Sequence, residues 1–177
     1  TLHAKLLGDG ALVFDIGSHV GDRAESFARL GANVVAFEPQ SDVFRALRLI
    51  LGRKAGVTLR NQAVGAEPGV LQMFINAANP TVSTASQGLI KAAKTADTWQ
   101  GQNWDGSVQV PVTTLDQIIA EFGTPDYVHI DVEGLELEVL TGLTQPLPLF
   151  SFEFTTIQRD VALACLNQIS ALEDYVF

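Results

Sequence analysis

The stretch that decides the fold is Val13-Phe14-Asp15-Ile16-Gly17-Ser18-His19-Val20-Gly21, followed further along by Phe37-Glu38-Pro39. An apolar run at 11–14 ends in an acid, two glycines and a helical pattern at 22–30 follow, and a second apolar run at 33–37 ends in another acid. This order predicts a strand, a glycine turn, a helix and a second parallel strand, with a carboxylate at the tip of each strand. In an open parallel sheet, ligands bind at these carboxyl ends.

The glycine spacing indicates which kind of ligand fits. A carboxylate such as Glu38 can accept hydrogen bonds from the two hydroxyls of a ribose. A dinucleotide site requires G-x-G-x-x-G, so that the backbone can approach a pyrophosphate, but here His19 stands in place of the second glycine. Asp15 would repel phosphate and attract a cation. The stretch therefore predicts a nucleoside-bearing cofactor without a closely bound pyrophosphate.

The pattern D-x-G-x-x-x-G with Glu38-Pro39 resembles motif I and the second-strand acid of class I S-adenosylmethionine-dependent methyltransferases. That cofactor carries an ammonium and a sulfonium and no phosphate, which agrees with the electrostatics of the loop. The implied fold is α/β, a Rossmann-like, doubly wound and mostly parallel sheet with helices on both faces.

Length and composition predict one globular domain spanning 1–177. The chain has 177 residues, 47% of them hydrophobic and 18% charged, with a net charge of −9. Such acidity argues against a nucleic-acid or anionic-membrane partner, because phosphate binding needs clustered Lys and Arg. The single cysteine, Cys165, excludes an internal disulfide and reads as a core residue. With no long apolar run and no signal peptide in the sequence, the expected location is the cytoplasm.

The rest of the chain continues the alternation of strands and helices. Strands are predicted at 57–60, 70–75, 108–112, 127–131 and 147–154, with one more beginning at 175–177, and helices at 41–51, 114–122, 134–142 and 158–172. Pro111 places the strand at 108–112 near a sheet edge. The polar segment 76–107, with Trp99 and Trp104 as its large anchors, is predicted to be a lid or an insertion loop with one short helix near 89–96. Either tryptophan could stack on an acceptor or anchor the loop.

Acidic residues gather near the ends of the later strands. His129 and Asp131 share one face of a strand, Glu133 lies just beyond, and Glu153 ends the next strand. We expect them to crowd the crevice that also receives Asp15 and Glu38, which would raise the pKa of at least one carboxyl group. Alternatively, Asp131 and Glu133 cap the helix that follows them.

A second resemblance is more specific. Thr114-Leu115-Asp116 and the block 126–142, which contains I-D-V-E-G-x-E-x-x-V-L-x-G, resemble the signature of FkbM-type methyltransferases; with the glycine loop, the similarity covers about residues 11–154. This family implies methyl transfer from S-adenosylmethionine, typically to an oxygen. Its acceptors include sugars and secondary metabolites. The fold it implies has seven strands, so the last strands are expected to be missing or truncated here.

The resemblance also implies roles for particular residues. Those expected to hold the methionine part of the cofactor are Asp15, Gly17, Ser18, His19 and Gly21. Glu38, beside Pro39, would bind the ribose, and Asn61, Gln62 and Ala63 lie where the adenine is met. Asp131 and Glu133 would face the transferred methyl group and the acceptor.

Methyl transfer needs an aligned acceptor and a base, and His129, Asp131 or Glu133 could serve as that base. A divalent cation held by Asp131, Glu133 and Glu153 could instead lower the pKa of the acceptor, although no compact ligand motif requires a metal. His19 is equally consistent with a residue that only shapes its loop, and His3 has no context that assigns it a role.

Three functions remain in competition. The leading one is a methyltransferase acting on a hydroxyl of a sugar or another small molecule, either as a monomer or as a homo-oligomer. An NAD-dependent oxidoreductase is disfavoured by the missing glycine motif. A non-catalytic, Rossmann-like domain that binds a nucleoside or a partner protein is the third.

Overall fold

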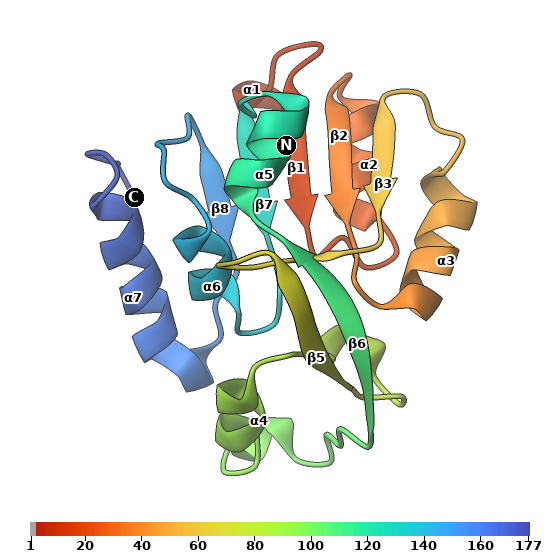
Figure 1. Cartoon of the computed structure of the whole chain (residues 1–177), viewed down its shortest axis with the longest axis vertical. Helices are drawn as coiled ribbons and strands as arrows, with labels where there is room; N and C mark the ends of the chain where they lie inside the picture. Colours follow the sequence, from red (N-terminus) through yellow and green to blue (C-terminus); the bar gives the residue numbers. More distant parts are fainter. Residues whose placement is uncertain (1–2) are drawn as a thin grey trace.

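The centre of the molecule is a parallel sheet of five strands in the order β3-β2-β1-β7-β8 (Figure 1). It is seen in a computed structural model that describes residues 3–177. The strands are β1 (Leu12–Ile16), β2 (Asn33–Phe37), β3 (Val57–Arg60), β7 (Tyr127–Ile130) and β8 (Phe150–Phe152). The chain builds outward from β1 through β2 to β3 and then returns to the other side of β1. This reversal confirms the predicted doubly wound sheet.

Helices cover both faces of this sheet because its strands are apolar on both sides. α2 (Asp22–Arg29) and α3 (Ser41–Leu51) pack on one face, where Val13 and Ala36 meet Phe27 and Leu47. α5 (Leu115–Phe122), α6 (Glu136–Thr141) and α7 (Arg159–Ser170) pack on the other face, where the side chains of Phe14 and Ile16 point. A short helix, α1 (His3–Leu6), precedes β1.

A second, three-stranded sheet lies at the carboxyl ends of the five strands, below them in Figure 1. Its order is β4-β6-β5, from β4 (Ala63–Val64), β6 (Gly106–Thr113) and β5 (Gly69–Ile75). Pro111 fits because β4 pairs only with Val112 and Thr113, so most of β6 has a partner strand on one side only. The sequence predicted β5 and β6 as strands but not their separate sheet.

Residues 76–107 join β5 to β6 and are more ordered than their composition suggested. They form two single 3-10 turns, η1 (Pro80–Val82) and η2 (Asp97–Trp99), and the helix α4 (Gln87–Ala93), capped by the Ser86 hydroxyl. Trp104 donates its indole N–H to the carbonyl of Val82 over 2.8 Å. Trp104 therefore anchors this segment.

Several predicted boundaries were wrong. Residues 175–177 form no strand; the Tyr175 hydroxyl instead bonds the backbone of Leu147 on both its N–H and its carbonyl. β8 is shorter than the predicted 147–154, and α6 begins at Glu136 instead of residue 134.

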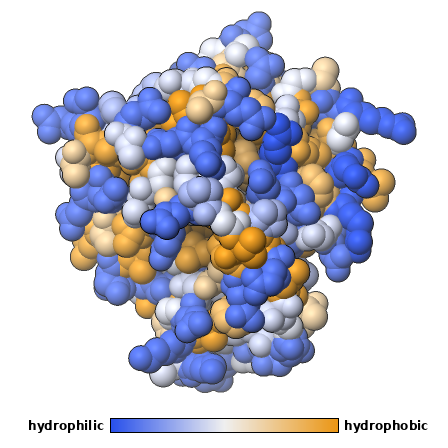
Figure 2. All heavy atoms as spheres, in the orientation of Figure 1, coloured by the Kyte–Doolittle hydropathy of each residue, from blue (hydrophilic) through white to orange (hydrophobic). Residues whose placement is uncertain are grey.

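Two observations describe the surface and the helices. Over the face shown in Figure 2, hydrophilic and hydrophobic residues are interspersed without one continuous hydrophobic patch. No helix within residues 3–177 has the length and apolar character needed to cross a membrane.

Candidate active site

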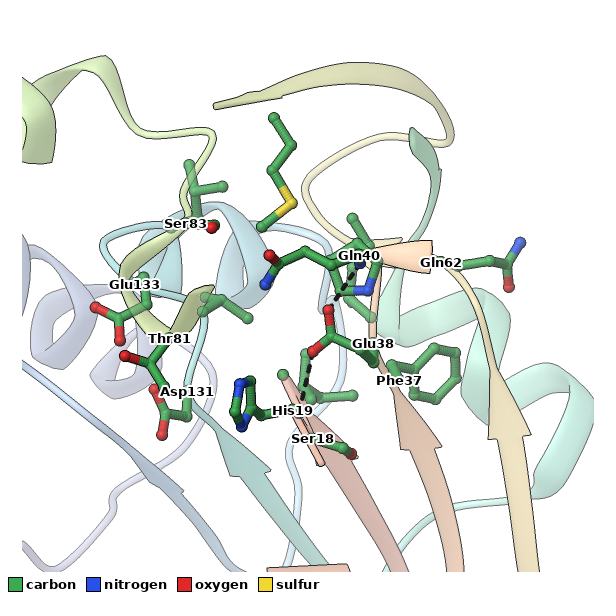
Figure 3. A pocket seen from close by; sticks show the side chains of 18 of the residues that line it. Ser18, His19, Phe37, Glu38, Gln40, Gln62, Thr81, Ser83, Asp131 and Glu133 are labelled. Carbon is green, nitrogen blue, oxygen red and sulfur yellow. Dashed lines mark hydrogen bonds between the residues drawn. The ribbon is translucent and has the colours of Figure 1, made fainter. Parts of the chain in front are cut away.

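A cavity of about 260 Å³ opens where β1, β2 and β7 end, at the reversal of strand order. Parallel sheets with helices on both faces bind ligands at this place. Predicted site residues that line the cavity are Gly17, Ser18, His19, Glu38, Pro39, Gln62, Ala63, His129, Asp131 and Glu133. Figure 3 shows Glu38 on one side of the cavity and Asp131 with Glu133 on the other.

Glu38 follows directly after β2, as predicted, and its carboxylate is held by backbone amides. His19 N–H donates to one oxygen over 3.0 Å, and Gln40 N–H donates to the other over 2.7 Å. Burial raises the pKa of Glu38 to about 7. Each oxygen keeps a lone pair that can accept a further hydrogen bond.

Three other predicted residues lie outside the cavity lining. Asp15 lies within β1 and not at its tip, fully buried, and its carboxylate has no hydrogen-bond partner among the described residues. Burial raises the pKa of Asp15 to about 6. Asn61 donates its amide to the carbonyls of Glu38 and Pro39, so it shapes the loop behind the cavity. Gly21 packs against α3, where a Cβ would collide with Leu47 and Leu51.

Gly17 fixes the position of the glycine loop. Its φ is 87°, and a Cβ on it would overlap the carbonyl oxygen of Asp131. The N–H groups of Gly17 and Ser18 both donate to the carbonyl of Phe37 over 2.9 Å. The loop is therefore held between the ends of β2 and β7.

The predicted crowding of acids occurs at the ends of β7 and β8. Asp131, Glu133 and Glu153 each place a carboxylate oxygen within 4.8 Å of the others. Burial, together with Glu153, raises the pKa of Asp131 well above its usual range. Burial and the charges of Glu153 and Glu136 raise the pKa of Glu133 to about 7. Neutral and ionised forms of Glu133 are thus both accessible near neutral pH.

The alternative that Asp131 and Glu133 cap the next helix was wrong. The N-cap of α6 is Leu135, and no side chain caps the helix. Glu136, the first residue of α6, instead accepts from the N–H groups of Val132 and Gly134 over 3.3 and 3.2 Å and so fixes the loop before the helix. Glu133 itself has a positive φ of 54°, an unusual conformation for a residue with a side chain. Asp131 and Glu133 are left to face the cavity.

The same acids offer ligands for a cation. Three carboxylate oxygens this close together suit a hard divalent ion such as Mg²⁺. A metal is not needed to offset the repulsion between these acids, because crowded carboxyl groups share protons at neutral pH. The three carboxylates therefore permit a bound metal ion and do not require one.

His129 lies on the cavity side of β7. Its Nδ1 is 3.0 Å from the Ser151 hydroxyl, which is 2.6 Å from the Tyr127 hydroxyl. This chain of contacts fixes the orientation of the imidazole ring beside Asp131.

Sequence reasoning missed the residues that close the cavity from the β5–β6 side. Leu71, Met73, Thr81 and Ser83 line it, as does Gln40 from the end of β2. Gln40 donates its amide to the carbonyl of Pro80 over 3.1 Å, which ties the two sides together. The only signal in the sequence was the placement of the polar segment 76–107 between strands.

Comparison with known proteins agrees with this arrangement. The model of the methyltransferase FkbM domain matches residues 15–161. This chain belongs to the FkbM methyltransferase family. The match contains the glycine loop after Asp15, Glu38 and the 126–142 block, so the resemblance seen in the sequence is confirmed.

One curated relative and one solved structure are similar to this FkbM domain. It is 30% identical over 158 residues to hexuronic acid methyltransferase AglP of Haloferax volcanii, an alignment that covers 85% of this chain and 57% of that protein. The crystal structure of methyltransferase FkbM from Methylobacillus flagellatus has a TM-score of 0.62 at 17% identity, over 97% of this chain and 40% of the other. The chain thus spans little more than half of its curated relative. At this identity the structural likeness shows the fold.

Proposed function

We propose that this domain transfers a methyl group from S-adenosylmethionine to a hydroxyl oxygen of a sugar or a related small molecule. The observation that carries the proposal is a single cavity with Glu38 on one side and the acids Asp131 and Glu133 on the other. Family membership supports methyl transfer, and the name of the AglP relative supports a sugar as the acceptor.

The residues that line the cavity fit the cofactor. Glu38 can accept the ribose hydroxyls on its remaining lone pairs, and Pro39, Gln62 and Ala63 line the part beyond it, toward an adenine. Gly17, Ser18 and His19, with Asp131 opposite, suit the methionine part. Bound there, S-adenosylmethionine would supply an electrophilic methyl group on a sulfonium, whose leaving group is the thioether S-adenosylhomocysteine.

The residues of the chain would orient the acceptor and take its proton. The Glu133 carboxylate would take the proton of the acceptor hydroxyl as that oxygen receives the methyl group. With its pKa raised by burial to about 7, Glu133 is a stronger base than an ordinary carboxylate and is still ionised at slightly alkaline pH. Asp131 and His129, which line the same side, would align the hydroxyl.

The acids also weigh against a domain that only binds. Buried carboxyl groups with raised pKa values in a cavity are costly to maintain and cluster at catalytic sites. Pure binding of a nucleoside would use Glu38 and would leave the group of Asp131, Glu133 and Glu153 without a role.

Calorimetric titration with S-adenosylhomocysteine tests the proposal, with NAD titrated in parallel. We expect micromolar binding of the first and none of NAD. Glu38→Ala should weaken binding about tenfold or more, because hydrogen bonds to charged groups contribute about 1.5–3 kcal/mol each. Glu67→Ala, in an exposed turn, removes the same charge and should bind like the wild type.

The rate of methyl transfer distinguishes a methyltransferase from a domain that only binds the cofactor. We expect Glu133→Gln to bind S-adenosylhomocysteine and to lose about a hundredfold or more in the rate of methyl transfer. No transfer by the wild-type protein to any member of a broad sugar panel, despite tight cofactor binding, would favour the non-catalytic reading.

A further inference from the structure

A second cavity of about 340 Å³ lies beside the first, at the carboxyl ends of β7 and β8. Among the described residues, Glu133 alone lines both cavities. The proposed base therefore stands between the cofactor cavity and a separate space of the size of a small ligand. Nothing in the proposed function so far gives this space a role.

The lining of the second cavity suits a ring that carries hydroxyl groups. Trp99 contributes an aromatic surface from η2, and Phe154, which is 62% exposed, contributes another just after β8. The polar residues Thr155, Thr156 and Gln158 line the same cavity. Aromatic faces pack against the apolar C–H faces of a sugar, while polar groups meet its hydroxyls.

Gln158 provides an independent sign of a missing ligand donor. Its side chain is 8% exposed, and its amide oxygen has no hydrogen-bond partner among the described residues, although the residue lines the cavity. An unpaired buried acceptor costs free energy unless a donor reaches it. A ligand hydroxyl in the cavity would supply that donor once the Gln158 amide turns to meet it, because the oxygen itself is buried.

The charge of the lining restricts the ligand further. Its carboxyl side chains are Glu133, Glu136 and Glu153, and no Lys, Arg or His lines it in residues 5–177. A carboxylate on the ligand would meet three acids without a compensating cation. Like charges brought together in a partly desolvated site oppose binding and thereby discriminate between ligands.

We propose that this second cavity is the acceptor subsite, and that it takes an uncharged sugar or polyol in preference to a sugar that bears a carboxylate. The proposal rests on the methyltransferase function, since it makes Glu133 the residue that faces both ligands. Trp99 and Phe154 hold the ring, the Gln158 amide oxygen accepts a hydrogen bond from one of its hydroxyl groups, and the acids disfavour uronates.

A matched pair of ligands tests the selectivity: methyl β-D-glucopyranoside and methyl β-D-glucuronide, which differ in a hydroxymethyl group or a carboxylate on the same ring carbon. In a Trp104→Phe variant, Trp99 is the only tryptophan and reports binding by fluorescence. With S-adenosylhomocysteine and EDTA present, we expect the glucoside to bind about tenfold or more tightly than the glucuronide. Trp99→Ala, followed by ligand-observed NMR, should weaken glucoside binding.

Charge reversal gives the sharper result. Glu153→Lys places a cation at the mouth of the cavity and should bring the two affinities to parity or favour the glucuronide. Glu67→Lys makes the same change of net charge in an exposed turn away from the lining, and it should leave the ratio unchanged.

Three outcomes would overturn the proposal. Equal or tighter binding of the glucuronide by the unsubstituted cavity would remove the charge argument. Glucuronide binding that appears only with Mg²⁺ would show that the acids hold a cation. If neither sugar binds while S-adenosylhomocysteine does, the subsite is contradicted and the proposed function stands. If a sugar binds but S-adenosylhomocysteine does not, the proposed function is contradicted and the sugar site stands.

Discussion

At the scale of single residues, Gly17 does the most to place the active site. Its positive φ and the carbonyl of Asp131 where a Cβ would lie mean that only glycine lets the loop approach the end of β7. This approach brings the loop residues that are proposed to bind the cofactor next to the acids that are proposed to act on the acceptor. The sequence indicated a glycine turn, but not the neighbour that requires it.

Replacing Gly17 by Ala should lower the free energy of unfolding by about 3 kcal/mol or more and abolish binding of S-adenosylhomocysteine, because the loop must move away from Asp131. Urea unfolding and calorimetry measure the two effects. Gly101→Ala is the matched control: Gly101 also has a positive φ, of 85°, but nothing lies within 4 Å of its added Cβ. It should lose only about 1–2 kcal/mol. Equal losses of unfolding free energy in the two variants would show that the close approach of Gly17 to the Asp131 carbonyl is not what requires glycine.

Asp15 should make the stability depend on pH. Burial raises its pKa in the folded protein from 3.8 to about 6, so the folded state binds the proton more tightly than the unfolded state. Stability from this group is therefore fully present below pH 4 and is lost as the pH rises through 6. A pKa shift of this size corresponds to about 3 kcal/mol.

Denaturation at a series of pH values checks this effect. Asp15→Asn should flatten the fall in stability between pH 4 and 7, whereas Asp105→Asn, at an exposed position, should keep the wild-type slope. Glu38, which also titrates in this range, is retained in both variants and contributes equally. Parallel curves for Asp15→Asn and the wild type would show that the buried carboxyl group is not the cause.

At the scale of elements, the segment 76–107 and the β4-β6-β5 sheet complete the site. Val82 and Trp99 from this segment reach the second cavity, and Thr81 and Ser83 reach the first. The Thr84 hydroxyl donates to the carbonyl of Glu133 over 2.6 Å. The segment is therefore joined to the backbone of the proposed base.

Thr84→Val should break this link with almost no change in side-chain volume. We expect a loss of about 1–3 kcal/mol in stability, since the carbonyl of Glu133 loses its donor, together with faster hydrogen exchange in residues 76–107. Thr95→Val removes a hydroxyl that donates to the carbonyl of Ala92 at an exposed position, and it should cost little. If hydrogen exchange in residues 76–107 is unchanged in Thr84→Val, the bond to the Glu133 carbonyl does not hold this segment in place. If the variant also binds S-adenosylhomocysteine like the wild type, the predicted lid role of the segment is contradicted.

At the scale of the whole molecule, the reversal of strand order gathers residues from across the sequence. β1, β2 and β7 end together, so Gly17, Glu38 and Asp131 surround one cavity although they lie far apart in the chain. The net charge of −9 adds a general repulsion toward anions.

A consequence of that charge is that nucleic acids should not bind. We expect no mobility shift of a DNA duplex or an RNA hairpin, even in low-salt buffer, where phosphate contacts are strongest. A basic DNA-binding protein run on the same gel shows that a shift would be seen. A shift that disappears as salt is added would reveal a basic surface that the overall charge conceals.

The sequence alone was enough to predict the alternation of strands and helices and the family. Apolar runs with acids after them fixed β2, β7 and the position of Glu38, because a parallel strand buried on both faces needs a continuous apolar stretch. The glycine spacing argued against a closely bound pyrophosphate, and the block at 126–142 indicated the family. These features are local, so a short window of sequence contains them.

Only the tertiary structure decided which of these residues meet. It buried Asp15 within β1, placed Asn61 behind the cavity, and gave Glu136 the N–H groups of the loop before α6. It also joined the two-residue strand β4 to β5 and β6 in a small sheet, and it brought Trp99, Phe154 and Gln158 together around a second cavity. Such outcomes depend on contacts between distant segments, whose packing and desolvation no local pattern records.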